Sequence, residues 1–251
     1  MSNRNLCQDS RMTYQTNILL PVAVDTAFTY ISKEDIPLGS FVRVPFRGRQ
    51  MIGVAWEGSQ GYLGKAKAVE AIVDIPPLPN TIRTFLKKVS EYTMTPLGNT
   101  LRLCFSSAFM EEKKVRKPLE IGTPDFSRQT VTLSAEQTEA ATAISQAVQD
   151  HIYETFLLDG VTGSGKTEVY LAAIQTALEQ GQQALVLLPE IALTNQWLDR
   201  FQRRFGCPPL QWHSTLTESQ RRQTWQAIIK GEAKVIVGAR SALFLPYPNL
   251  G

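Results

Sequence analysis

The chain has 251 residues, of which 43% are hydrophobic and 20% are charged, and its formal net charge is +3. This length allows one large or two ordinary domains, and the composition is typical of soluble globular proteins. Three widely spaced cysteines exclude a disulfide framework and a self-contained zinc site, and they favour a reducing compartment, so we expect a cytoplasmic protein. The polar N-terminus and the lack of a long apolar run predict neither a secretion signal nor membrane association.

Short apolar runs separated by glycines occupy the first 75 residues. The expected strands cover residues 18–22, 27–31, 41–44, 51–56 and 68–75. This spacing predicts a small β-barrel or an open β-domain. The first 130 residues hold 17 basic and 12 acidic side chains. Such a mild basic excess is compatible with nucleic-acid binding, but it also occurs on ordinary solvated surfaces.

Helical periodicity begins after the proline-rich segment 76–79. Apolar residues recur on one face over 82–89, and a second helix is expected over 97–109, so the two should form a helical hairpin against the β-domain. The charged segment 111–130 is poor in apolar residues and indicates a linker. We therefore expect one domain over residues 1–110, a linker over 111–130 and a second domain over 131–251.

The second half of the chain alternates helices with strands. Ser134 and Gln137 have the spacing of a capping box, which predicts the start of a helix. Further helices are expected over 168–180, 191–205 and 218–230, and strands over 155–158, 184–188, around Leu210 and over 234–237. This alternation predicts an α/β fold in which helices cover both faces of a parallel sheet.

One segment fits the phosphate-binding loop G-x-x-x-x-G-K-[ST] at every fixed position. Its residues are Gly160, Val161, Thr162, Gly163, Ser164, Gly165, Lys166 and Thr167. Glycines let backbone N–H groups surround phosphates, while Lys166 can reach the β- and γ-phosphates and the Thr167 hydroxyl can ligate Mg²⁺. The expected strand before the loop and helix after it supply the context that this motif requires. The sequence therefore predicts a nucleoside triphosphate site.

Four blocks in the second half, in this order, resemble the helicase motifs of the primosomal replication-restart helicases. They are residues 160–170, residues 188–194, His213-Ser214 and residues 237–244. In the first half, residues 28–30, 43–46, 67–69 and 96–98, together with Tyr92, resemble that family's domain for binding the 3′ end of a nascent DNA strand. The resemblance covers the chain from about residue 16 onward. It implies a RecA-like motor lobe, incomplete here, preceded by a small β-barrel-like DNA-binding domain with helices.

The resemblance also implies roles in nucleotide binding. The cofactors would be ATP and Mg²⁺, with Lys166 and Thr167 as catalytic residues and Thr167 as the metal ligand. Gln137 stands where the family places a glutamine before the ATPase core, and its amide could pair with the adenine edge. An alternative is equally open, in which Gln137 serves only the capping box of its own helix.

For DNA, the resemblance implies two groups of contacts. Phe28 would offer a stacking face and Lys67 a phosphate contact in a pocket for the strand end. The implied contacts with the phosphates of a tracked strand come from Thr194, His213, Arg240 and Ser241. Two of these have simpler interpretations, because Arg240 could be an ordinary surface arginine and His213 could cap a strand end.

Two positions of the strand-end pocket depart from the family pattern. Thr29 stands where the family has an acid, so a carboxylate that would accept from a terminal 3′-hydroxyl is replaced by a more weakly bonding hydroxyl. Arg47 stands where the family has glycine, with Gly48 one position later. The sequence therefore predicts a weakened or altered pocket.

Other departures concern whole motifs. The twenty residues after Met110 leave no room for the family's winged-helix domain, and the chain ends before the family's acidic Walker B motif, second motor lobe and zinc-binding cysteines. Two hypotheses follow. The chain is part of a DNA-dependent ATPase and helicase that acts on forks and single-stranded DNA with other primosome proteins and single-strand-binding protein, or it is a nucleotide- and DNA-binding module without turnover. An unrelated phosphate-loop kinase or transporter ATPase does not explain the block at residues 240–244.

Overall fold

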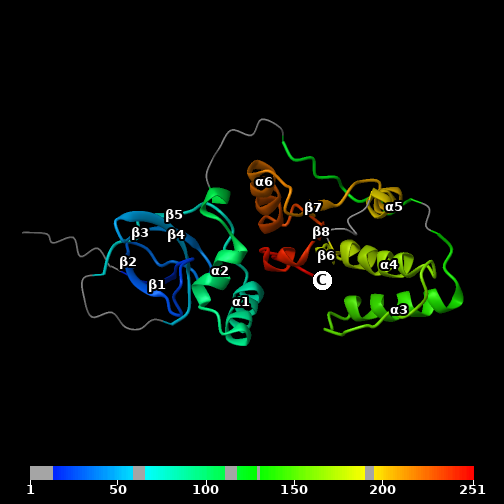
Figure 1. Ribbon diagram of the computed structural model, residues 1–251, viewed down its shortest axis with the longest axis horizontal. Coiled ribbons are helices and arrows are strands. Elements are labelled where there is room, and N and C mark those ends of the chain that lie inside the picture. Colours follow the sequence, from blue (N-terminus) through cyan, green and yellow to red (C-terminus); the bar gives the residue numbers. More distant parts are fainter. Residues whose placement is uncertain (1–13, 59–65, 111–117, 129–130, 190–194) are drawn as a thin grey trace, which may run out of the picture. The chain divides into compact units, whose positions relative to one another are not determined.

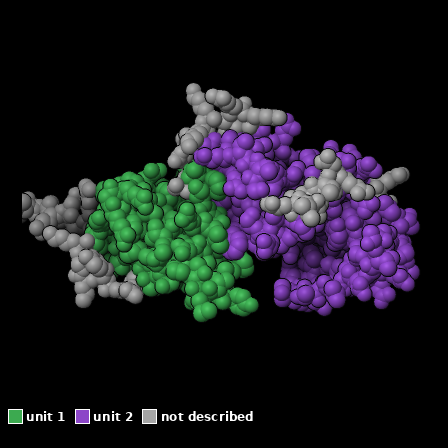
Figure 2. All heavy atoms as spheres, viewed as in Figure 1, with its two compact units in different colours: residues 1–110 green, residues 111–251 purple. Residues whose placement is uncertain are grey.

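The computed structural model describes residues 14–58, 66–110, 118–128, 131–189 and 195–251 (Figure 1). The chain divides into two compact units, residues 1–110 and residues 111–251, which are coloured separately in Figure 2. Among the helices that the structure describes, none is both long enough and apolar enough to span a bilayer.

The first unit is a curled antiparallel sheet of strand order β2-β1-β4-β3-β5 (Figure 1). The strands are β1 (Tyr14–Leu19), β2 (Phe28–Ser32), β3 (Phe41–Phe46), β4 (Arg49–Ala55) and β5 (Ala71–Ile72). The segment that contains β5 joins the two sides of the four longer strands: Ala68 bridges to Ile31 of β2, and Ala71 of β5 pairs with Arg43 of β3. The sheet is thereby almost closed, which confirms the predicted small β-domain.

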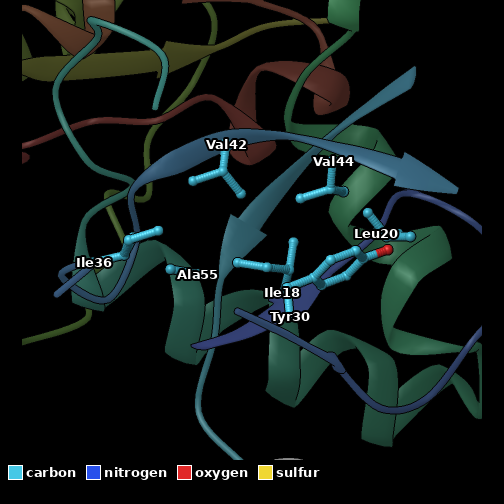
Figure 3. Packing of buried hydrophobic residues seen from close by; sticks show 7 residues of the cluster. All are labelled: Ile18, Leu20, Tyr30, Ile36, Val42, Val44 and Ala55. Carbon is cyan, nitrogen blue, oxygen red and sulfur yellow. The ribbon is translucent and has the colours of Figure 1, made fainter. Parts of the chain in front are cut away.

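The core of this sheet follows from the alternation of side chains along the strands. In β3, Val42 and Val44 are fully buried while Arg43 between them is exposed. Figure 3 shows that the inward side chains of several strands converge on one cluster. Its buried members are Ile18, Leu20, Tyr30, Ile36, Val42, Val44 and Ala55. Burying aliphatic side chains of this size stabilises a fold by about 1.5–3 kcal/mol each.

Two helices pack beside the sheet, α1 (Asn80–Thr93) and α2 (Leu97–Cys104), and a 3₁₀ turn, η1 (Ser107–Met110), follows. Their connection turns at Met94, which has left-handed backbone geometry with φ 51°. Gly98 lies where α2 meets the loop after β1, and its N–H donates to the Val24 carbonyl at 2.8 Å. The expected helix over 97–109 ends early because Phe105 turns extended and packs edge-on against Phe41, with ring centroids 5.3 Å apart.

The second unit is built on a parallel sheet of strand order β6-β8-β7. Its strands are β6 (Ala184–Leu187), β7 (Leu210–Trp212) and β8 (Val235–Gly238), and its helices are α3 (Ala135–Gln149), α4 (Lys166–Glu179), α5 (Asn195–Phe205), α6 (Glu218–Ile229) and the 3₁₀ helix η3 (Arg240–Phe244). Both α3 and α6 begin at a capping box, with Ser134 and Thr217 as the N-cap residues. The predicted α/β fold with a parallel sheet is confirmed.

One expected strand of the second unit is wrong. Residues 155–158 have no strand structure, and Leu157 within them is 93% exposed. A run of four residues, three of them apolar, does not specify a strand by itself, because a strand becomes stable only when a neighbouring strand satisfies its backbone groups. The described sheet instead forms from β6, β8 and β7, and the phosphate-loop motif follows an irregular segment.

A buried glutamine joins three segments of the second unit. Gln183 precedes β6 and is only 1% exposed. Its side-chain amide donates to the carbonyls of Ala233 at 2.8 Å and Ile228 at 3.3 Å, and its side-chain oxygen accepts from the Asn249 N–H at 3.3 Å. Every polar atom of this side chain is therefore bonded, as burial of an amide requires.

Residues 118–128 belong to the segment expected as a linker, and they pack against the rest of the second unit. The Leu119 N–H donates to Oε1 of Gln223 at 2.8 Å, and the Asp125 N–H donates to the Phe205 carbonyl at 2.9 Å. The Ser127 hydroxyl and N–H, together with Arg128, hold the pKa of the exposed Asp125 carboxyl below its usual range.

Candidate functional site

The phosphate-loop motif folds into a loop that leads directly into α4. Gly163 and Gly165 have positive φ angles of 86° and 80°, which glycine adopts without strain. The Lys166 ammonium lies over this loop, where it donates to the carbonyls of Gly160 and Val161, the latter at 3.0 Å. A phosphate group can replace these carbonyls as the acceptor. The loop N–H groups and the start of α4 add the partial positive charge that favours an anion.

Gln137 connects the capping box of α3 to this loop. Its side-chain oxygen accepts from the Ser134 N–H at 2.9 Å, and its Nε2 donates to the Ser164 carbonyl at 2.8 Å. A Cβ on Gly165 would displace the same amide, and the positive φ of Gly165 favours glycine there in any case. The amide is engaged at both ends, and the structure thus gives Gln137 a loop-positioning contact that sequence alone did not indicate.

We expect Gln137→Ala to lower the thermal stability of the second unit and to weaken ATP and GTP binding by the same factor. Removing a capping side chain costs about 1 kcal/mol, and the loop would lose one anchoring hydrogen bond. Thermal unfolding and titrations with both nucleotides measure these effects. A selective loss of ATP binding, with GTP affinity unchanged, would instead support the pairing of Gln137 with adenine.

The Thr167 hydroxyl is oriented by two aromatic side chains. Tyr170 donates to Oγ1 of Thr167 at 3.2 Å, and Trp197 of α5 donates to the Tyr170 hydroxyl at 2.9 Å. Oγ1 keeps a second lone pair, so it suits the Mg²⁺ role that the motif predicts. Within the described residues no group of three His, Cys, Asp or Glu side chains gathers. The motif itself predicts that Thr167 and the phosphates of the nucleotide would hold a divalent ion here.

A cavity of about 630 Å³ opens beside the loop, and α5 forms its opposite wall. Three arginines of α5 line it: Arg200, Arg203 and Arg204. Glu168 pairs with Arg204 at 3.5 Å and with Arg200 at 3.8 Å. Burial lowers the pKa of Arg204, and the nearby Glu168 opposes that effect. With Lys166, the cavity holds four cationic side chains and one carboxylate, a charge balance that suits a triphosphate.

Sequence reasoning missed these arginines, although a signal for them exists. Their spacing of i, i+3 and i+4 places them on one face of a helix. The phosphate-loop motif alone gives no reason to expect α5 beside the loop. In addition, the buried Nε of Arg204 has no acceptor within the described part of the chain.

A second group of predicted residues meets at one edge of the parallel sheet. Trp212 of β7 and Leu187 of β6 both pair with Gly238 of β8, so the carboxyl ends of the three strands are level. His213 follows β7, and Arg240 and Ser241 follow β8. The side chains of Arg240 and Ser241 are exposed. Oγ1 of Thr215 lies 2.7 Å from Nδ1 of His213. Thr194 lies outside the described residues.

The third group lies in the first unit, around a cavity of about 470 Å³ that we call the strand-end pocket. Its lining includes Phe28, Thr29, Tyr30, Phe46, Arg47 and Lys67, so the three predicted strand-end residues Phe28, Thr29 and Lys67 are brought together. The rings of Phe28 and Phe46 are 5.2 Å apart. The Thr29 hydroxyl donates to Oδ1 of Asn17 at 3.2 Å.

Arg47 occupies an uncommon backbone conformation at the rim of this pocket. It and Gly48 form the two-residue hairpin between β3 and β4, and their φ angles are 47° and 79°. Positive φ at both positions is the geometry of a type I′ turn, which favours Asn or Gly. For an arginine it costs about 1 kcal/mol. The guanidinium lies over the Phe46 ring at 5.3 Å from the centroid.

Comparisons with known proteins agree with this arrangement. Residues 17–106 match the family model of the 3′DNA-binding domain (3′BD), and residues 126–247 match that of the DEAD/DEAH box helicases. The chain thus combines a DNA-binding domain with a helicase-type nucleotide-binding domain, and these matches indicate DNA and a nucleotide as ligands.

Relatives with both parts narrow the class to one family. The replication restart protein PriA of Rickettsia conorii is 36% identical over 242 residues, which are 93% of this chain and 36% of that relative. PriA of Bacillus subtilis is 44% identical over 119 residues, and PriA of Haemophilus influenzae is 46% identical over 121 residues; these are 47% and 48% of this chain and 15% and 16% of those relatives. The chain belongs to the PriA family of replication restart proteins. It spans about a third of the length of the Rickettsia relative.

Proposed function

We propose that this chain binds ATP and fork DNA as part of an ATP-dependent 3′-to-5′ DNA helicase of replication restart. The observation that carries the proposal is the cavity beside α4. The phosphate loop with Lys166 forms one side of this cavity, and the arginines of α5 line the opposite wall. When bound, Mg²⁺ would neutralise phosphate charge and polarise the transferring phosphoryl group. Lys166 would bind the β- and γ-phosphates, and Thr167 would hold the ion.

The two DNA surfaces have different tasks in this proposal. His213, Arg240 and Ser241, at the carboxyl edge of the parallel sheet, contact the phosphates of the tracked strand together with Thr194. Phe28, Thr29 and Lys67 hold the 3′ end of a nascent strand in the strand-end pocket. Forked DNA, single-stranded DNA, other primosome proteins and single-strand-binding protein would be the partners, and the work would take place in the cytoplasm.

The test is ATP hydrolysis by this polypeptide, with and without forked DNA that carries a 3′ strand end at the branch. We expect hydrolysis to be stimulated by the fork. If the chain binds ATP and fork DNA but does not hydrolyse ATP in either condition, its function is binding without turnover. Failure to bind either ligand would overturn the proposal as a whole.

DNA binding should be sensitive to salt and insensitive to base sequence, because the proposed contacts are mainly with phosphates. For single strands, the logarithm of the affinity should fall with the logarithm of the salt concentration with a slope of about −0.7 per phosphate contacted. Titrations of several unrelated oligonucleotides at a series of salt concentrations measure both properties. A strong preference for one base sequence would count against phosphate-based recognition.

A further inference from the structure

Among the described residues that line the strand-end pocket, two side chains are cationic and none is acidic. Arg47 and Lys67 both line it, and none of the described lining residues is Asp or Glu. A hydroxyl at a strand end is neutral and donates one hydrogen bond, which a carboxylate would accept best. A terminal phosphate is instead a dianion near neutral pH and offers three acceptor oxygens. The charge of this pocket therefore matches a phosphate better than a hydroxyl.

The other walls of the pocket suit the rest of a terminal nucleotide. Phe28 and Phe46 present aromatic surface, on which a base can stack without regard to its identity. The Thr29 hydroxyl proton is already directed to Asn17, so Thr29 offers the pocket an accepting oxygen rather than its donor. The charged donors among the described lining residues are the guanidinium of Arg47 and the ammonium of Lys67.

The backbone of Arg47 is strained, because its φ angle of 47° is uncommon for an arginine. It holds a left-handed conformation that Asn or Gly would adopt with less strain, at the one turn that delivers its side chain to the pocket rim. Strained residues of this kind gather at functional sites. The backbone of Lys67 is held by β2, since its carbonyl accepts from the Ile31 N–H at 2.9 Å.

We propose that the strand-end pocket binds a DNA strand that ends in a 3′-phosphate in preference to one that ends in a 3′-hydroxyl, with Arg47 and Lys67 contacting the terminal phosphate. This proposal rests on the proposed binding of strand ends in the pocket and names the chemistry of the end. Such an end cannot be extended by a polymerase until its phosphate is removed, so the pocket would recognise blocked ends.

The experiment compares three single-stranded DNA ligands of one sequence: a linear strand with a 3′-phosphate, the same strand with a 3′-hydroxyl, and a closed circle without an end. Fluorescence anisotropy with the full chain gives the three affinities. We expect the 3′-phosphate strand to bind about tenfold more tightly than the 3′-hydroxyl strand. This ratio should shrink as salt rises, because the additional contact is ionic.

Two arginine variants make the result specific. Arg47→Asn should lower the ratio of the two linear strands from about ten to about three, because Lys67 keeps its contact with the terminal phosphate. It should preserve or raise the thermal midpoint, since Asn tolerates the turn geometry. Arg49→Asn removes the same charge from the neighbouring exposed strand position, which does not line the pocket, and should leave the ratio unchanged.

Two results would overturn the inference, and they differ in what they say of the proposed function. If both linear strands bind more tightly than the circle but equally to each other, the pocket holds ends without sensing the phosphate. If the circle binds as tightly as both linear strands, the pocket does not hold ends, and its assignment under the proposed function fails as well.

Discussion

Lys166→Ala is expected to weaken ATP binding by roughly 10- to 150-fold and to abolish any hydrolysis. The variant removes the ammonium that lies over the phosphate loop, and a hydrogen bond to a charged group contributes about 1.5–3 kcal/mol. Isothermal titration with ATP measures the affinity directly. The upward shift of the thermal midpoint that ATP produces should shrink in proportion, because ligand stabilisation follows the ratio of concentration to Kd.

The control for this variant is Lys230→Ala, which removes the same charge from an exposed position outside the cavity. Its ATP affinity should equal that of the unmodified chain. The thermal midpoint of Lys166→Ala without nucleotide should also be close to normal, because within the described residues the hydrogen bonds of this lysine go to two carbonyls of the loop. Unchanged ATP affinity in Lys166→Ala would remove the assignment of the nucleotide site.

Gly98→Ala is expected to destabilise the first unit by about 2–3 kcal/mol or more and to lower its DNA binding only where the variant begins to unfold. A Cβ at this position would lie against the carbonyl oxygens of Leu20 and Val22, closer than van der Waals contact allows. Both obstacles are backbone atoms, so α2 would have to move away from the sheet. Alanine normally stabilises a helix by about 1 kcal/mol relative to glycine, but overpacking costs about 1–3 kcal/mol and sometimes more, so the clash should dominate.

Urea unfolding followed by circular dichroism, together with DNA titration, tests this expectation. Asn99→Ala, one residue further along α2, adds no atom against the sheet and should change stability by far less. ATP affinity should be retained in Gly98→Ala, because every residue of the nucleotide cavity lies between Val131 and Arg204. A Gly98→Ala chain of normal stability would show that α2 can shift without loss of packing.

Where a local pattern determines the structure, the sequence was sufficient to predict it. The capping box of Ser134 and Gln137 correctly located the start of α3, since both of its hydrogen bonds join residues three positions apart. The short apolar run over residues 41–44, between glycines, similarly predicted a strand, and β3 (Phe41–Phe46) contains it. The segment 155–158 shows the limit of such patterns: it has the residues of a strand, but whether a strand forms depends on a neighbour that may be far away in the chain.

The same distinction explains which parts of the candidate site could be predicted. The phosphate loop is a contiguous motif, so its residues were identified together. The contacts of Gln137 with Ser164 and of Arg204 with Glu168 span 27 and 36 residues, and they depend on how helices pack rather than on any local spacing. Arg47 was recognised as a departure from a pattern, but its left-handed backbone follows from the hairpin register of β3 and β4.

The bonds of Gln183 have a consequence for the order in which the second unit can form during synthesis. Its partners at Ile228, Ala233 and Asn249 follow it by 45, 50 and 66 residues. At 5–20 residues per second, a ribosome needs roughly 2–13 s to supply them. For most of that interval, until residues 235–238 are made, β6 lacks its partner strand β8, so the nascent chain exposes the apolar sequence Ala-Leu-Val-Leu. The growing polypeptide is therefore most open to chaperone binding, or to aggregation, after β6 emerges and before the last twenty residues are complete.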